Sequence, residues 1–106
     1  MTGRHDDESF GEALVRITRA AERYSQKSGL PLNPDPAVRG YVLRGLARNL
    51  LAYGRAYCPC RDVAGDPATD RRNICPCRTH RDEVESQGSC ECGLYVSARM
   101  AEELKN

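Results

Sequence analysis

The chain has 106 residues and a formal net charge of +1, with no tryptophan, one phenylalanine and five tyrosines. This length suits a single domain over residues 1–106 with a modest core, which an added staple such as a metal centre would help to hold together. No segment approaches the roughly 20 apolar residues of a membrane span, and no basic run with interleaved aromatic residues suggests a nucleic-acid partner. We therefore expect a protein that binds neither membranes nor nucleic acids. The polar N-terminus lacks the apolar stretch of a secretory signal, so we expect a cytoplasmic location, with residues 1–8 disordered.

Residues 9–54 contain no cysteine and form the first half, in which we expect two helices. Ser9 and Glu12 fit a capping box at the start of the first helix, and Ser28 with Gly29 suits its end. Apolar residues recur between these ends at helical spacing, namely Phe10, Leu14, Ile17, Ala21 and Tyr24.

The second helix is expected to start at Asp35 as N-cap with Pro36 at the first helical position, and to close at Gly54. One face of this helix is apolar, with Val38, Val42, Leu46 and Leu50 along it and Tyr41 and Leu43 broadening it. We expect the two apolar faces to pack on each other and to back the cysteine-rich half.

Residues 55–106 form this second half and read as less regular. The polar stretch from Asp62 to Asn73 holds at most a short helix, and Leu94 to Val96 suits a short extended piece. Ser97 suits the cap of a final helix, Ala98 to Lys105, whose buried side is expected to be Met100, Ala101 and Leu104. The sequence thus predicts a small, mainly α domain of about four to five short helices with cysteine-bearing loops.

All six cysteines lie within residues 58–92, as three Cys-x-Cys units: Cys58-Pro59-Cys60, Cys75-Pro76-Cys77 and Cys90-Glu91-Cys92. A disulfide framework would leave the first half unbridged and is rare in reducing compartments. Structural zinc sites usually space paired ligands two to four residues apart, which these units do not. A [4Fe–4S] cluster needs four thiolates, and the two sulfurs left over would form a redox-active pair beside it. This third interpretation uses all six residues.

The order of the three units resembles the catalytic subunit family of ferredoxin–thioredoxin reductase, including its prokaryotic ferredoxin:disulfide reductase relatives. The segments Tyr24–Gly29 and Val42–Ala47, and the approach Tyr57–Arg61, resemble that family as well. The similarity covers about residues 9 to 97.

The resemblance implies a role for each cysteine. Cys58, Cys75, Cys77 and Cys90 would bind the [4Fe–4S] cluster, and Cys60 and Cys92 would form the active-site disulfide. It further implies that Cys60 is the exposed nucleophile and that Cys92 interacts with the cluster during turnover. The positions of the six cysteines in the sequence do not by themselves show which four bind iron.

The third unit departs from the family, in which it is usually Cys-His-Cys with a histidine that assists proton transfer. Here Glu91 stands between the two cysteines. Glu91 is one candidate for the replacement. His80 is the other, and its alternative interpretation is an exposed loop histidine.

The resemblance implies an enzyme, a ferredoxin:thioredoxin (disulfide) reductase. Ferredoxin would be the electron donor, a thioredoxin- or glutaredoxin-like protein the substrate, and a separate small β-barrel subunit a further partner. The stretch 55–81 carries six arginines and three aspartates, a balance of +3, and favours an acidic partner. Five arginines near the cluster loops are candidates for docking ferredoxin: Arg61, Arg71, Arg72, Arg78 and Arg81. The alternative functions are a cluster-containing electron-transfer or redox-sensing module and a structural zinc-binding module.

Overall fold

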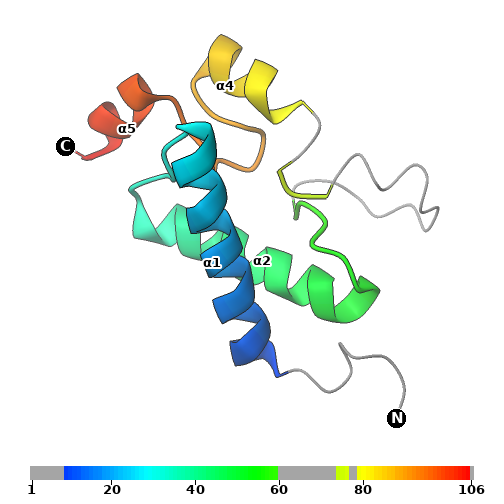
Figure 1. The fold of residues 1–106 in the computed structure, drawn as a ribbon. Coiled ribbons are helices and arrows are strands. Elements are labelled where there is room, and N and C mark those ends of the chain that lie inside the picture. Colours follow the sequence, from blue (N-terminus) through cyan, green and yellow to red (C-terminus); the bar gives the residue numbers. More distant parts are fainter. Residues whose placement is uncertain (1–8, 60–73, 77–78, 106) are drawn as a thin grey trace.

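The computed structural model describes residues 9–59, 74–76 and 79–105, and this part of the chain contains four helices (Figure 1). In chain order they are α1 (Phe10–Ser28), α2 (Pro36–Tyr53), α4 (His80–Gln87) and α5 (Ala98–Lys105). The predicted mainly α fold is therefore confirmed. The predictions of disorder at residues 1–8 and of at most a short helix at residues 62–73 fall outside the described residues.

Helix α1 begins at the predicted capping box. The backbone N–H of Glu12 donates to Ser9 Oγ at 3.1 Å, and the backbone N–H of Ser9 donates to Glu12 Oε1 at 2.9 Å. These hydrogen bonds hold the pKa of the Glu12 carboxyl below its usual value. Gly29 ends the helix in a left-handed conformation, with φ at 81°. The buried face consists of Ala13, Ile17 and Ala21, and Phe10 lies at its margin with 37% of its surface exposed.

Helix α2 also has the predicted ends. Asp35 Oδ1 accepts from the backbone N–H of Ala37 at 2.9 Å, and Gly54 closes the helix with φ at 78°. Its buried residues are Val42, Leu43, Gly45, Leu46 and Ala47. The prediction that Tyr41 broadens this face is wrong, because Tyr41 is 64% exposed. Residues two apart on an α-helix are about 200° apart, so Tyr41 and Leu43 lie on nearly opposite sides.

The predicted extended piece is present and is buried. Leu94, Tyr95 and Val96 are 0%, 2% and 0% exposed. Antiparallel bridges join Tyr95 to Leu32 and Val96 to Ser89. The segment that follows the third cysteine unit is therefore attached to the turn between α1 and α2.

The two short helices differ in how well the sequence predicts them. Ser97 Oγ accepts from the backbone N–H of Met100 at 3.0 Å, as expected for the cap of α5. Ala101 is buried, but Leu104 is 41% exposed because the last turn points toward the outer edge of the molecule (Figure 1). Helix α4 was not individually predicted, since only His80 and Val84 are buried in it and it carries no apolar stripe.

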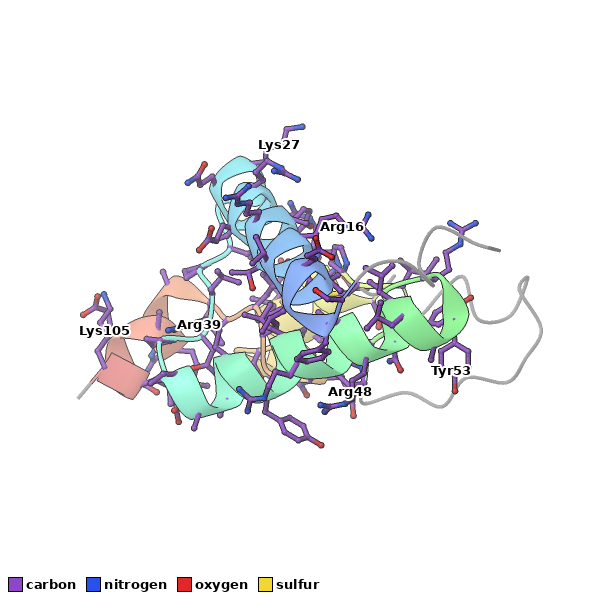
Figure 2. All side chains as sticks on the ribbon, turned by 90° about the horizontal axis from the view of Figure 1, so that it is seen from below. Arg16, Lys27, Arg39, Arg48, Tyr53 and Lys105 are labelled. Carbon is purple, nitrogen blue, oxygen red and sulfur yellow. The ribbon has the colours of Figure 1, made fainter. Side chains whose placement is uncertain are left out.

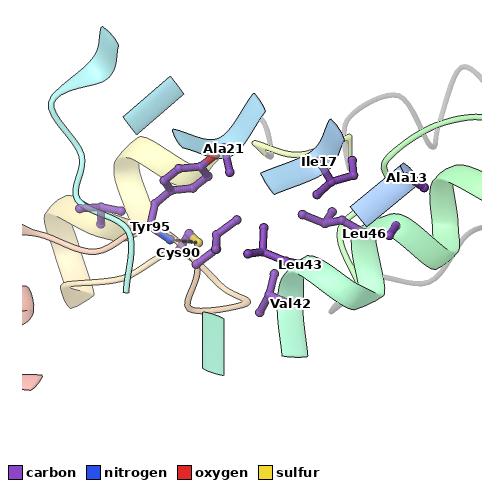
Figure 3. Close-up of a cluster of buried hydrophobic side chains, with 11 residues drawn as sticks. Ala13, Ile17, Ala21, Val42, Leu43, Leu46, Cys90 and Tyr95 are labelled. Atoms are coloured by element: carbon purple, nitrogen blue, oxygen red, sulfur yellow. Dashed lines mark hydrogen bonds between the residues drawn. The ribbon is translucent and has the colours of Figure 1, made fainter. Parts of the chain in front are cut away.

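The core lies between α1 and α2 and continues into the cysteine half, where Cys90 and Tyr95 join it (Figure 3). Cys75 and Cys92 pack against its edge. None of the described helices is long and apolar enough to cross a membrane.

Candidate functional site

Cys90 and Cys92 lie in a tight turn directly before the buried extended segment. The backbone N–H of Cys90 donates to the Tyr95 carbonyl at 2.9 Å, and that of Gly93 donates to the Cys90 carbonyl at 2.9 Å. Gly93 has φ at 84°, a conformation that glycine adopts without strain, so the chain can reverse just after Cys92. The Sγ atoms of Cys90 and Cys92 are 3.8 Å apart. The two sulfurs of the third unit therefore lie side by side.

The first and second cysteine units approach each other through a short antiparallel pairing. Tyr57 and Ile74, which directly precede the two units, form an isolated bridge. The backbone N–H of Cys75 donates to the Ala56 carbonyl at 2.9 Å. The Cys58 side chain is fully buried, and that of Cys75 is half-buried. The pairing thus brings together the starts of two cysteine units that are distant in the sequence.

Helix α2 contacts the first cysteine unit at two points. Asn49 Nδ2 donates to the Tyr57 carbonyl at 2.7 Å. The Pro59 ring packs on the helix at Gly45, where a Cβ added to the glycine would lie 2.7 Å from Pro59 Cβ. Both contacts fix the chain on either side of Cys58 to a rigid element.

The turn before α2 supports the third unit through Asn33, which is 5% exposed. Its Nδ2 donates to the Gly93 carbonyl at 2.9 Å, and its Oδ1 accepts from the backbone N–H of Asp35 at 2.9 Å. Arg39 Nη1 donates to the Asn33 carbonyl at 2.7 Å. Both ends of this buried amide are thus hydrogen-bonded, and they tie the residue after Cys92 to the start of α2.

Tyr95 lies close to cysteines of two units. Its burial raises the pKa of the phenol well above the usual value, and negative charge on Cys75, Tyr24, Cys90 and Cys92 raises it further. The backbone N–H of Tyr95 donates to Cys90 Sγ at 3.4 Å, and Figure 3 shows the two residues together. Cys75, Cys90 and Cys92 therefore all lie near one buried ring.

A cavity of about 140 Å³ lies beside this ring. Cys75, Pro76, Tyr24 and Tyr95 line one part of it, and the remaining walls are aliphatic: Ile17, Ala20, Ala21, Leu46 and Ala56. Cys75 is thus placed against a largely apolar space.

The thiol of Cys90 has a pKa raised well above its usual range. The hydrogen bond with Cys92 is the main cause, and burial and negative charge on Cys92 contribute as well. Cys90 therefore holds its proton more tightly than an ordinary cysteine does. It must lose its proton to become a metal ligand.

The two candidate proton donors lie in different surroundings. The Glu91 side chain is exposed, and its backbone N–H donates to Glu83 Oε1 at 2.9 Å. His80 is not an exposed loop residue, because it is the first residue of α4 and only 8% exposed. His80 Nε2 lies 2.5 Å from the hydroxyl of Tyr24, and the two rings meet edge to face with centroids 5.4 Å apart.

Sequence reasoning did not find the group formed by Tyr24, His80 and Tyr95. The Tyr95 ring centroid lies 5.2 Å from that of Tyr24 and 6.2 Å from that of His80. Tyr24 and His80 are 56 positions apart, and no local pattern joins residues at such a separation. The composition is the one signal that could have pointed to this group. The chain has only five tyrosines and two histidines from which a buried group of aromatic rings can be built.

Several predicted site residues fall outside the described part of the chain. These are Cys60, Cys77, Arg61, Arg71, Arg72 and Arg78. Arg81 is described and is exposed on α4. Within residues 9–59, 74–76 and 79–105, no three Cys, His, Asp or Glu side chains gather closely enough to hold a metal ion. Three of the four predicted ligands are described, namely Cys58, Cys75 and Cys90.

A comparison with protein-family models gives a match over residues 7–106 to the ferredoxin thioredoxin reductase catalytic beta chain. The chain belongs to this family. The resemblance carried by the three cysteine units is therefore confirmed, and the match extends past both of its expected ends. Membership of the ferredoxin thioredoxin reductase catalytic chain family supports a disulfide reductase role. A comparison with curated protein sequences found no match.

The chemistry of the described thiols fits the iron–sulfur cluster associated with this family. Cluster iron is held by cysteine thiolates, and burial and hydrogen bonds to sulfur tune its potential. Cys58 and Cys90 are buried, Cys75 faces a largely apolar cavity, and Cys90 Sγ accepts a backbone hydrogen bond. These residues offer soft ligands, two of them buried and the third half-buried.

Proposed function

We propose that this chain is an iron–sulfur disulfide reductase. It takes electrons one at a time from ferredoxin and delivers them to a Cys60–Cys92 disulfide, which then reduces a thioredoxin-like protein disulfide. Membership of the family supports the reductase role. The single observation that carries the proposal is the 3.8 Å separation of Cys90 Sγ and Cys92 Sγ, which places a proposed ligand next to a proposed redox cysteine. Tyr95 lies beside the second and third units, because its backbone N–H donates to Cys90 Sγ and it lines one cavity with Cys75.

In this proposal Cys58, Cys75, Cys77 and Cys90 hold one [4Fe–4S] cluster. When bound, the cluster supplies a centre that accepts and passes on single electrons. The protein's contribution is to hold Cys92 beside a ligand, and the 3.8 Å separation of the Cys90 and Cys92 sulfurs supports this. The anchors at Asn33 and Gly45 support the rigidity that such a site needs.

The two remaining cysteines carry the exchange reaction. Two electrons and two protons convert the Cys60–Cys92 disulfide into two thiols. The Cys60 thiolate attacks one sulfur of the substrate disulfide, which forms a mixed disulfide and releases the other substrate sulfur as a thiol after protonation. Cys92 then attacks Cys60, which restores the Cys60–Cys92 disulfide and releases the substrate as a dithiol.

The free energy available is sufficient for this reaction. A plant-type ferredoxin lies near −400 mV and thioredoxin near −270 mV. The gap of about 130 mV corresponds to roughly 6 kcal/mol for two electrons. No nucleotide is required, and the sequence contains neither a GxGxxG nor a Walker motif.

Glu91 is the proposed source of the proton that Cys92 needs when the disulfide opens. It is covalently placed between Cys90 and Cys92, and its exposed side chain can exchange protons with water. His80 is the second candidate. It is less accessible, because it is buried and its Nε2 is hydrogen-bonded to Tyr24.

The organisation of the whole molecule is also a proposal. Residues 1–106 form one domain, with a two-helix half at 9–54 and a cluster half at 55–106. The protein acts in the cytoplasm on a thioredoxin- or glutaredoxin-like protein, and a separate small β-barrel subunit is a further partner.

Anaerobic purification followed by visible absorption spectroscopy tests the cofactor. A brown protein with broad absorbance near about 400 nm supports a cluster. A colourless protein that contains zinc would sink the proposal. Alkylation of Cys60 in the reduced protein then separates the reductase from a cluster-containing module for electron transfer or redox sensing. Only the reductase loses function with the cluster intact.

A further inference from the structure

A stripe of exposed residues runs along α2 on the side away from the core. Tyr41, Arg44 and Arg48 stand three and four residues apart, so they lie on one side of the helix. Tyr41 is 64% exposed, and both arginines are exposed. Figure 2 shows Arg48 projecting from α2 on the side away from α1. We refer to these three residues as the α2 stripe.

The charge around the α2 stripe is one-sided. Residues 36–59 contain four arginines and no aspartate or glutamate. Arg44 folds back over the helix, so that its Nη1 would lie 2.9 Å from a Cβ added to Gly40. Neither Arg44 nor Arg48 forms an ion pair with another residue of the described part of the chain. The stripe therefore combines an exposed tyrosine with two guanidinium groups that have no ion-pair partner among residues 9–59, 74–76 and 79–105. Tyrosine and arginine are enriched in protein interfaces.

The α2 stripe adjoins the first cysteine unit. Gly45 lies one turn after Tyr41 and just under one turn before Arg48, and Pro59 packs directly on it. Pro59 is bonded to Cys60, the proposed nucleophile. A protein that lies on the stripe would therefore reach the first cysteine unit without crossing the core.

We propose that Tyr41, Arg44 and Arg48 form the docking surface for the protein whose disulfide Cys60 attacks, and that this partner is acidic beside its disulfide. The inference rests on the proposed function and adds to it the surface and the charge of the substrate. Opposite charge on the two partners increases the rate of encounter, and salt screens the effect.

Capture of a mixed disulfide measures docking without electron transfer. A Cys92→Ser variant cannot resolve the bond that forms between Cys60 and a substrate sulfur. Two synthetic peptides serve as substrates, each with one Cys-x-x-Cys disulfide, flanked by four glutamates in one and by four glutamines in the other. Hydroxyethyl disulfide, which is small and uncharged, reports the intrinsic reactivity of Cys60. Mass spectrometry follows the rate of mixed-disulfide formation.

At about 50 mM salt the acidic peptide is expected to react about three- to tenfold faster than the neutral one, and the ratio should approach one at about 0.5 M salt. Arg44→Glu with Arg48→Glu, added to Cys92→Ser, should abolish or invert the preference. The matched control reverses two exposed arginines on α1, Arg19→Glu with Arg23→Glu, and should keep the preference. If the α2 reversal fails to fold, Arg44→Gln with Arg48→Gln takes its place and should bring the ratio close to one.

Two outcomes distinguish a failure of the docking surface from a failure of the proposed function. Equal rates for the two peptides, or a preference that survives the α2 substitutions, would overturn the docking surface while leaving the reductase intact. Failure of hydroxyethyl disulfide to form any mixed disulfide with Cys60 would overturn the proposed function itself.

Discussion

Pro59, which separates the first two cysteines, lies directly against Gly45 in the middle of α2. A Cβ added to Gly45 would lie 2.7 Å from Pro59 Cβ and 3.0 Å from Pro59 Cγ, closer than ordinary van der Waals contact. Because Gly45 has no side chain, the first cysteine unit can rest on the helix backbone. Cys58, the residue before Pro59, is fully buried.

Gly45→Ala is therefore expected to destabilise the protein. Alanine raises helix propensity by about 1 kcal/mol, but the collision with a rigid proline ring should cost about 1–3 kcal/mol and push the first unit outward. Denaturation by urea under anaerobic conditions gives the free energy of unfolding. Gly40→Ala is the matched control, because the three atoms nearest to its Cβ would all belong to the flexible end of Arg44. If both variants gain stability equally, the contact between Gly45 and Pro59 does not hold the loop.

Asn33→Asp is expected to lower the free energy of unfolding by about 1–3 kcal/mol. The carboxylate can still accept from Asp35 N–H but cannot donate to the Gly93 carbonyl, and it places a charge at a site that is 5% exposed. Urea denaturation again measures the loss. Asn49→Asp provides the comparison for the first unit, since Asn49 Nδ2 donates to the Tyr57 carbonyl and aspartate cannot. An unchanged midpoint in Asn33→Asp would show that the third unit does not depend on this anchor.

Much of the scaffold could be predicted from the sequence, because its signals are local. Ser9, Glu12, Asp35 and Gly54 act within one helical turn, and each has the predicted role at a helix end. The apolar stripes also predict the contact between α1 and α2. Tyr41 was placed wrongly because its residue type suggested burial while its helical angle did not.

The site was less predictable, because its geometry depends on residues that are distant in the sequence. Asn33 contacts Gly93 from 60 positions away, and Tyr24 meets His80 across 56 positions. The order of the three Cys-x-Cys units nevertheless predicts the family, and the family match confirms it. Which cysteines bind iron could not be worked out from the residues alone and stays a proposal.

Serine substitutions are expected to divide the six cysteines into two groups. Replacing Cys58, Cys75, Cys77 or Cys90 should remove the cluster and disturb the fold around it, because cluster binding and folding are coupled. Replacing Cys60 or Cys92 should leave a brown protein. Iron analysis and visible absorption of the six purified variants give the comparison. A colourless Cys60→Ser variant would show that the ligands were assigned wrongly.

Glu91→Gln is expected to slow disulfide reduction by about 10- to 100-fold, since glutamine keeps the size and polarity of the side chain but supplies no acidic proton. Glu91→His should recover most of the rate by restoring the usual family residue. Turnover across about pH 6 to 9 measures both, with cluster absorbance as the control for integrity. If Glu91→Gln matches the parent over this range, the proton comes from elsewhere, and His80→Ala becomes the deciding variant.

The central claim is that a cluster and a cysteine pair act together to reduce a protein disulfide. Anaerobic turnover with reduced ferredoxin and oxidised thioredoxin measures this directly, by counting ferredoxin oxidised against thiols formed. Two ferredoxin molecules should be oxidised per disulfide reduced, because each donates one electron and the disulfide takes two. Cys60→Ser should lose this turnover while its cluster absorption remains. Undiminished thioredoxin reduction by Cys60→Ser, or no reduction by a parent protein that carries the cluster, would contradict it.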